Sequence, residues 1–334
     1  MKEIKAGPNE AGQRLDKLLL KYLNQAGYGF IQKMLRKKNI TLNDHKATGK
    51  EILAPDDSIK IYFSDDTLNK FAVHLGTGRT VSDEYRKWSP EIIYEDADVL
   101  ILNKPVGMLS QRAKPEDYSL VDWVLDHMLE QQEISGEERE RFKPGICNRL
   151  DRNTSGIVVA GKTLGGLQYF NQLFKDRTIH KYYRCLTFGT VQEVAVLDGY
   201  LIKDPKTNRV TLIKTPREGA SKIRTSWRPV ETGNLFGIPV TLLEVELITG
   251  KPHQIRSHLA SIGHPIVGDY KYGSRQQNDR LRKNLAVTSQ LLHAYRLEMP
   301  SDTPEAFRKL AGKIFTAEVP GIFMRAVENM RSNI

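Results

Sequence analysis

The hydrophobic pattern separates a small first unit from a larger second one. Within residues 13–63, apolar residues recur twice at helical spacing, and short runs typical of strands follow at 40–42 and 58–63. The first predicted helix has its apolar side chains at Leu15, Leu18, Leu19, Tyr22 and Leu23. The second has them at Ile31, Met34 and Leu35. Two helices with a few strands predict a small α/β domain over residues 1–66.

The period is lost after residue 63. The stretch that follows contains Gly76, Gly78, Pro90 and charges of both signs, a composition typical of loops. We therefore expect a linker at 67–90, which leads into a larger domain at 91–325.

Strands dominate the larger domain. A strand pair is predicted at 92–94 and 99–102, and helices are predicted where Ser119 and Thr163 can cap apolar faces. Further strands are predicted at roughly 182–189, 197–203, 209–214, 222–230 and 238–248. Because helices separate only some of these strands, we expect an α+β fold with a largely antiparallel mixed sheet and flanking helices, not a wound parallel sheet.

Composition excludes several classes of protein. No apolar run approaches the roughly 20 residues of a membrane span, and the N-terminus lacks the apolar segment of a signal peptide. Only two of the 334 residues are cysteines, Cys147 and Cys185, which excludes a disulfide scaffold and fits a reducing compartment. We expect a cytoplasmic protein with no membrane partner, and a monomer.

The net charge of +10 favours an anionic partner, nucleic acid first. Much of the excess lies between residues 31 and 50, which hold six basic residues against Asp44 alone. The basic residues of the second predicted helix are Lys33, Arg36, Lys37 and Lys38. We expect these four side chains to contact RNA phosphates. A solvated basic helix face is the alternative interpretation.

One carboxylate stands out from the rest of the chain. Asp151 lies between Arg149 and Arg152, directly before the apolar run 157–160. A carboxylate flanked by cations is expected to stay ionised, and a loop backed by a rigid strand can hold it for chemistry. Taken alone, a salt-bridged loop residue before a core strand is an equally good interpretation.

Two motif matches fail on physical grounds. Gly156–Thr163 fits the phosphate-binding pattern G-x-x-x-x-G-K-[ST], but Ile, Val, Val and Ala between the glycines favour a buried strand over a loop. His253, His258 and His264 are five and six residues apart, so no two share a helix face as ligands at i and i+4 would. We expect neither a nucleotide cofactor nor a metal.

Two further segments bear on the role of Asp151. Pro252 suits the first turn of a helix that Gly263 would end. Arg256 then lies one turn in, where its guanidinium can reach a loop carboxylate and hold it in a bidentate pair. On the strand 181–186, alternation places Tyr183 where it can stack on a base, although most such tyrosines only pack.

These motifs, in this order, resemble those of the RluA-type pseudouridine synthases. Arg149-Leu150-Asp151-x-x-Thr154-Ser155-Gly156 is similar to the family's catalytic motif, and Glu95-Asp96 with Asn103-Lys104-Pro105 to its first one. Lys181-x-Tyr183 and the segment 249–258 resemble the later motifs. Residues 13–63 resemble the S4 RNA-binding module, in a layout most similar to the RluC branch. Two departures are Asn148, where the family usually has His, and Lys251-Pro252 in place of Arg-Thr.

The resemblance implies a reaction and roles for these residues. Asp151 would act on a uridine in RNA, whose N1–C1′ bond breaks before the uracil rotates and rejoins through C5. It implies that Arg256 pairs with Asp151, that Tyr183 stacks on the uracil, and that Arg149 fills the space which the flipped uridine leaves. Whether the carboxylate attacks carbon or takes a proton stays open. No metal, nucleotide or redox cofactor is implied.

Three targets or functions follow from this resemblance. The leading one is a pseudouridine synthase for specific uridines in large-subunit ribosomal RNA, which the S4-like domain favours. The alternatives are a transfer RNA target and a non-catalytic RNA-binding factor of ribosome assembly with the same fold. The presence of Asp151, Tyr183 and Arg256 argues against the last, because a protein that only binds RNA does not need the carboxylate.

Overall fold

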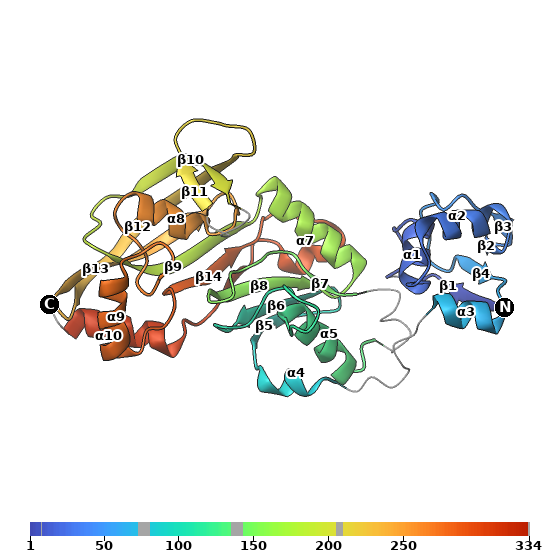
Figure 1. Cartoon of the computed structure of the whole chain (residues 1–334), viewed down its shortest axis with the longest axis horizontal. Helices are drawn as coiled ribbons and strands as arrows, with labels where there is room; N and C mark the ends of the chain where they lie inside the picture. The colour runs from blue at the N-terminus through green and yellow to red at the C-terminus, as the bar shows by residue number, and fades with distance from the viewer. Residues whose placement is uncertain (8, 73–80, 135–142, 205–209, 333–334) are drawn as a thin grey trace.

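The structure is a computed structural model that describes residues 1–7, 9–72, 81–134, 143–204 and 210–332. Its strands form two separate sheets, one of four strands and one of eleven. Figure 1 shows the four-stranded sheet and its helices gathered at the N-terminal end, while the long strands form the larger sheet. The architecture confirms the predicted α+β fold, which a small α/β domain precedes in the sequence.

The small domain packs two helices against an antiparallel sheet. Its strands, in the order β1-β4-β2-β3, are β1 (Lys2–Lys5), β2 (Ile40–Leu42), β3 (His45–Lys46) and β4 (Ser58–Ile61). Its helices are α1 (Leu15–Tyr22) and α2 (Tyr28–Arg36). Their apolar faces, which include Leu18 and Ile31, pack with Ile59 in one buried core. The helices and strands predicted between residues 13 and 63 are confirmed.

The segment expected to be a linker begins and ends with short helices. Helix α3 (Asp65–Phe71) contributes Phe71 to the core of the small domain, and helix α4 (Asp83–Lys87) packs Tyr85 against the core of the large one. Each helix begins at a capping serine, Ser64 or Ser82, and is too short to show a hydrophobic period. Gly76 and Gly78 lie outside the described residues, and the domain boundaries stay an expectation.

The large sheet is mixed but mostly antiparallel, as predicted. Its main strands, in spatial order, are β11 (Val210–Ile213), β10 (Ala195–Lys203), β12 (Ser221–Leu235), β13 (Ile238–Leu247), β9 (His180–Phe188), β14 (Leu292–Glu298), β8 (Ser155–Gly161), β6 (Val99–Lys104) and β5 (Glu91–Glu95). Strand β7 (Gly145–Ile146) pairs with β8, and β15 (Ile314–Thr316) with β14. Among the described strands, only β8 and β14 pair in parallel.

Helices flank both faces of β8. These helices are α5 (Leu120–Glu130) and α7 (Leu164–Asp176), which follow the capping residues Ser119 and Thr163 as predicted. The core with α5 holds Val158, and the opposite core with α7 holds Val159. Burial on both faces explains the apolar run of this strand and confirms that the residues resembling a phosphate loop form a strand.

The remaining helices lie toward the C-terminal end of the sequence. They are α8 (Gln254–Ser261), α9 (Arg275–Leu285), α10 (Gly321–Ser332) and the 3₁₀ helix η1 (Glu305–Leu310). Helix α8 follows Pro252 and ends before Gly263, close to the predicted bounds. Across the described part of the chain, no helix has both the length and the apolar character needed to span a membrane.

Candidate active site

A cleft of about 870 Å³ brings the separate sequence motifs together. The loop before β8 contributes Arg149 and Asp151, the start of β9 contributes Tyr183, and helix α8 contributes Arg256. These segments are far apart in sequence, and the antiparallel pairing of β9 with β13 carries the start of β9 next to the end of β13, from which the chain enters α8. The cleft therefore contains the three residues expected to act in catalysis.

The loop around Asp151 is fixed on both sides of the carboxylate. On one side, the Ser110 hydroxyl donates to Leu150 O at 2.8 Å, and on the other the Lys104 Nζ donates to Arg152 O at 3.2 Å. Thr154 N closes the turn by donating to Asp151 O at 3.0 Å. The Asp151 side chain keeps 27% of its surface exposed, so it is anchored through its backbone and accessible from the cleft.

Lys104 is fully buried and serves this loop rather than a carboxylate partner. Its Nζ also donates to Met108 O at 2.9 Å and to Pro105 O at 3.0 Å. Burial lowers the pKa of Lys104 to about 7, although the negative charge of Asp151 opposes this change. The sequence resemblance included Lys104 in a motif but gave it no role in the site.

Asn148 stands where the family usually has His, and its contacts show how the loop accommodates this departure. Its Nδ2 donates to Ile157 O at 3.0 Å, and its Oδ1 accepts from Val159 N at 2.8 Å. The side chain thus bonds to the backbone of β8 and attaches the loop to the strand. A carboxamide does this with one donor and one acceptor, so the substitution leaves the loop anchored.

Gly156 lets β8 approach β14 at the cleft. Its φ is +113°, and a Cβ atom at this position would lie 2.2 Å from Ala294 O. Only glycine fits such a close backbone contact. The glycine therefore permits the parallel contact between β8 and β14, and it lies two residues after Thr154 in the turn of Asp151.

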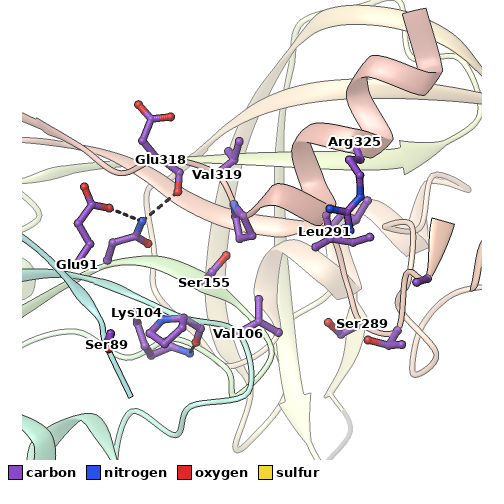
Figure 2. A pocket seen from close by; sticks show the side chains of 16 residues that line it. Ser89, Glu91, Lys104, Val106, Ser155, Ser289, Leu291, Glu318, Val319 and Arg325 are labelled. Carbon is purple, nitrogen blue, oxygen red and sulfur yellow. Dashed lines mark hydrogen bonds between the residues drawn. The ribbon is translucent and has the colours of Figure 1, made fainter. Parts of the chain in front are cut away.

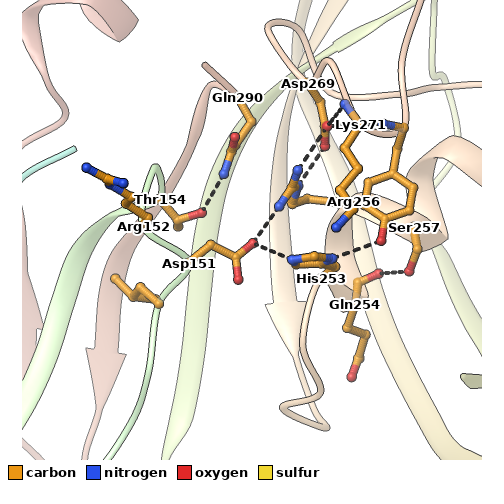
Figure 3. A network of polar contacts seen from close by, with 12 residues as sticks. Asp151, Arg152, Thr154, His253, Gln254, Arg256, Ser257, Asp269, Lys271 and Gln290 are labelled. Carbon is orange, nitrogen blue, oxygen red and sulfur yellow. Dashed lines mark hydrogen bonds and ion pairs between the residues drawn. The ribbon is translucent and has the colours of Figure 1, made fainter. Parts of the chain in front are cut away.

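Arg256 links Asp151 to a second, buried carboxylate (Figure 3). Its Nη1 donates to Asp151 Oδ2 at 2.7 Å, while its Nε and Nη2 donate to the two oxygens of Asp269 at 2.7 and 3.0 Å. The predicted contact with Asp151 is present, but the expectation of a bidentate pair there is wrong. Fully buried Asp269 takes the two-pronged contact because a buried carboxylate needs a matched partner.

This arrangement keeps Arg256 charged. Burial opposes the charge, but the hydrogen bonds and charge of Asp269, followed by the charge of Asp151, raise the pKa of Arg256 above its usual value. Asp269 is itself oriented by the backbone N–H groups of Lys271 and Tyr272, at 2.9 and 3.2 Å. A permanent cation is therefore held rigidly against Asp151.

Tyr183 forms a buried wall of the cleft. It is 5% exposed and lies between Val245 of β13 and Ala294 of β14 in the sheet. Burial and the nearby charge of Asp151 raise the pKa of Tyr183, so the ring carries a neutral phenol at neutral pH. Tyr183 lines the cleft, and an aromatic residue in such a position can stack on a base.

Lys181 is a further cation of the cleft. Its Nζ lies 5.6 Å from the ring centroid of Phe174, which also lines the cleft. Burial, followed by the charge of Arg177, lowers the pKa of Lys181 to about 8. The sequence placed this lysine in a motif without giving it a function.

The residues expected to contact RNA fall into two groups. Arg149 lines the cleft and is exposed. Lys33, Arg36, Lys37 and Lys38 are exposed side chains on α2 and the turn that follows it. None of these four basic side chains lines the cleft. The structure therefore groups them with one another and not with Asp151.

His253, Asp269 and Tyr272 are site residues that the sequence analysis missed. His253 belongs to the segment that resembles a family motif, but the one role considered for it was that of a metal ligand. Its Nδ1 lies 2.8 Å from the Tyr272 hydroxyl, and its Nε2 lies 3.9 Å from Asp151 Oδ2. His258 and His264 bond elsewhere, to Thr225 Oγ1 and Phe188 O. In the sequence, one feature could have pointed to Asp269 and Tyr272 as site residues: they lie in the block Gly268–Gly273, where polar residues stand between glycines.

A second cavity, of about 510 Å³, lies beside the starts of β8 and β14 (Figure 2). Lys104, Val106 and Arg325 are among its lining residues. Asn103 bridges its wall by donating to Glu91 Oε2 at 3.1 Å and to Glu318 O at 3.0 Å. None of the predicted site residues lines this cavity, so the cleft with Asp151 is the candidate active site.

Comparisons with known proteins agree with this geometry. The family model described as RNA pseudouridylate synthase matches residues 98–261. An uncharacterized RNA pseudouridine synthase of Mycoplasma genitalium is 31% identical over 296 residues, which cover 88% of each chain. The ribosomal large subunit pseudouridine synthase D of Borreliella burgdorferi is 31% identical over 240 residues, which cover 71% of this chain and 68% of that protein.

Among solved structures, human RNA pseudouridylate synthase domain containing 4 has a similar fold. The TM-score is 0.56 at 22% identity, with 72% of this chain and 92% of that chain covered. At this identity the likeness concerns the fold alone, which is that of a pseudouridine synthase. Together with the sequence relatives, it leads to one conclusion: this chain is an enzyme of the RNA pseudouridine synthase family.

Proposed function

We propose that this enzyme converts specific uridines of large-subunit ribosomal RNA into pseudouridine, with Asp151 as its catalytic carboxylate. The observation that carries this proposal is the arrangement of Asp151 in the cleft. Arg256 contacts it at 2.7 Å, and Tyr183 lines the same cleft. Several relatives bear the name ribosomal large subunit pseudouridine synthase D, which supports the ribosomal target.

The reaction requires an ionised carboxylate and a site that retains the detached uracil. The N1–C1′ bond breaks, the C5–C1′ bond forms, the proton on C5 is lost and N1 gains a proton. Attack on carbon and removal of a sugar proton both require the ionised form of Asp151, with which the neighbouring guanidinium of Arg256 forms an ion pair. No oxidant or reductant is consumed in this balance.

Tyr183 is assigned to hold the detached uracil. A neutral, buried phenol offers its face to the base and keeps water from that side. The cleft volume of about 870 Å³ leaves room for a flipped nucleotide and parts of its neighbours. Flipping the uridine out of its RNA helix costs a few kcal/mol. We assign the exposed side chain of Arg149, which lies at the cleft, to fill the space that the flipped uridine leaves.

The small domain is assigned to RNA binding of the S4 kind. Its exposed basic residues are Lys33, Arg36, Lys37 and Lys38. Such side chains supply affinity and orientation through phosphates, without base specificity. The sequence layout of the small domain favours the RluC branch, whereas several relatives are named pseudouridine synthase D. The uridines that the enzyme modifies therefore decide to which branch of the family it belongs.

The target is tested with RNA labelled with tritium at uracil C5. Purified enzyme is incubated with large-subunit ribosomal RNA and, separately, with transfer RNA, and released tritium is counted. The proposal predicts release from the ribosomal RNA and its absence from transfer RNA. Release from transfer RNA alone would contradict the ribosomal target, and no release from either RNA or from ribosomal precursor particles would support the binding-factor alternative.

A further inference from the structure

Lys181 places an ammonium group in the cleft between helix α7 and the segment that leads into α8. It is the second residue of β9, and it lines the cleft together with Phe174 and Gly250. Its Nζ lies 5.6 Å from the Phe174 ring centroid and 3.9 Å from the position that a Cβ atom would take on Gly250. Within the described part of the chain, Nζ has no hydrogen-bond acceptor and no carboxylate at ion-pair distance.

The buried cations of the described residues are matched, in contrast to Lys181. Lys104 donates to three carbonyl oxygens, Lys162 pairs with two glutamates at 2.8 and 2.5 Å, and Arg256 pairs with two aspartates. An ammonium group that is withdrawn from water without an acceptor is costly. The exception at Lys181 is explained if its acceptor arrives with the substrate.

The charged groups near Lys181 do not supply this acceptor. Burial, followed by the charge of Arg177, lowers the pKa of Lys181 to about 8, and the charge of Glu246 opposes this change. Glu246 lies in register with Tyr182, so strand alternation places it on the opposite face of the sheet from Lys181. There its Oε1 lies 2.8 Å from His180 Nδ1.

The cleft as a whole favours an anionic ligand. Besides Lys181 and the imidazole of His253, its charged lining residues are Arg149, Asp151, Arg152, Lys251 and Arg256. Asp151 is the one acidic residue among the described residues that line it, and Arg256 is paired with it at 2.7 Å. The remaining cations attract the phosphates of a nucleic acid.

The spacing along β9 fits a single nucleotide. Lys181 and Tyr183 are two residues apart and both line the cleft, so they lie on one face of the strand, roughly 7 Å from each other. In a nucleotide, the sugar separates the base from its phosphate by a similar length. A base stacked on Tyr183 therefore brings a phosphate within reach of the Lys181 ammonium group.

We propose that Lys181 binds a phosphate group of the uridine nucleotide whose base stacks on Tyr183. The phosphate supplies the acceptor that the ammonium group lacks, and hydrogen bonds between two charged groups are short and strong. This contact holds the sugar and its phosphate in place while the detached uracil rotates. The inference rests on the proposed function, because it requires RNA in the cleft.

The first test uses the pH dependence of RNA binding. A bound phosphate favours the charged form of Lys181, so affinity should fall as pH rises past about 8, the pKa of this lysine without RNA. For the full chain and a large-subunit ribosomal RNA transcript, we expect wild type to lose about tenfold in affinity between pH 7 and pH 9 relative to Lys181→Arg, which stays charged. A constant ratio of the two affinities across this range would overturn the inference.

The second test removes the charge with Lys181→Met. We expect binding at pH 7 to weaken by about 10- to 100-fold, the loss of one charged contact. The slope of log affinity against log salt should fall by about 0.7–0.9, the value for one phosphate. Lys175→Met, at an exposed position of α7 outside the cleft, is the matched control and should change neither quantity.

Two results of this second test would overturn the inference. Lys181→Met could bind as tightly as wild type, or it could bind more weakly with an unchanged salt slope. The latter result would indicate a neutral oxygen of the base in place of the phosphate. The comparison of wild type with Lys181→Arg does not need this variant, so it decides the question even where Lys181→Met does not fold.

Turnover separates this inference from the proposed function. Release of tritium from C5-labelled ribosomal RNA should show a lower kcat/KM for Lys181→Met, which Lys181→Arg restores. Equal kcat/KM for wild type and Lys181→Met would overturn the phosphate contact. No release by wild type, with binding that depends on pH as predicted, would instead contradict the proposed function and leave Lys181 as a residue that binds RNA.

Discussion

At the scale of single residues, the site depends on charges that are buried and fully partnered. Arg256 is 7% exposed and joins Asp151 to Asp269, which is wholly buried. It therefore makes one contact with the proposed catalytic carboxylate and two with a carboxylate of the protein interior. Truncating it would leave the Asp269 carboxylate buried without its cation.

Arg256→Ala should accordingly remove turnover and also destabilise the protein by about 3–5 kcal/mol. Adding Asp269→Asn should recover part of the stability but none of the turnover, because the buried charge is gone while Asp151 stays unpaired. Arg331→Ala is the matched control, since that arginine pairs with Glu231 on the surface and exposed pairs of this kind contribute little to stability. Denaturant unfolding of the three variants measures these effects. Equal stability of Arg256→Ala and wild type would contradict this role.

Lys104 gives a pH dependence whose sign is fixed. Its pKa is about 7 in the folded protein and about 10.4 when unfolded, so between these values the unfolded chain binds more protons and stability rises with pH. Below pH 7 both states are charged and the contribution is constant. Relative to Lys104→Met, wild type should gain about 1–3 kcal/mol from pH 7 to pH 9. A constant difference across this range, measured by denaturant unfolding, would show that Lys104 is charged in the folded state.

At the scale of elements, the parallel contact between β8 and β14 holds the loop of Asp151 against the sheet. Gly156 makes this contact possible. Gly156→Ala should destabilise the protein by more than about 1 kcal/mol and reduce turnover, because Ala is strained at positive φ and meets Ala294. Gly29→Ala in α2 is the control, since a Cβ there meets nothing within 4 Å and Ala favours a helix.

Thermal unfolding and single-turnover rates of both glycine variants test this account. The control should keep its turnover and should unfold at the same or a higher temperature. Wild-type turnover in Gly156→Ala would mean that the β8–β14 contact does not position Asp151.

Much of this element-level organisation follows from local patterns. The strands from β9 to β13 and the caps at Ser119 and Thr163 were predicted because period and capping are local properties. Helices α3 and α4 were missed because seven and five residues are too few to show a period. The candidate site follows the same rule. Asp151, Tyr183 and Arg256 could be predicted from the sequence because each of them belongs to a local motif.

Other parts of the site depend on contacts that no local pattern contains. Asp269 competes for the guanidinium of Arg256, and this competition decides which carboxylate receives two hydrogen bonds. Tyr272 bonds to His253 and to Val210, which is 62 residues away in sequence. Lys104 anchors a loop 48 residues away. Each of these contacts becomes evident only when the sheet has brought its strands together.

At the scale of the whole molecule, a basic small domain accompanies a catalytic domain that has its own cleft. Lys37→Ala with Lys38→Ala should weaken RNA binding and lower the slope of log affinity against log salt by roughly 1.5–2. Arg308→Ala with Lys309→Ala, two exposed residues of η1, removes the same charge and should leave the slope unchanged. Binding isotherms at several salt concentrations measure both. Equal slopes for the two double variants would remove the small domain from RNA binding.

The central claim is that Asp151 in this cleft breaks the glycosidic bond of a uridine. Its most direct test is tritium release from ribosomal RNA labelled at uracil C5, with wild type and Asp151→Asn compared under single-turnover conditions. The isosteric amide keeps the size of the side chain and removes its charge. We expect release by wild type and none by the variant at equal RNA binding. Release by Asp151→Asn at the wild-type rate would contradict the claim.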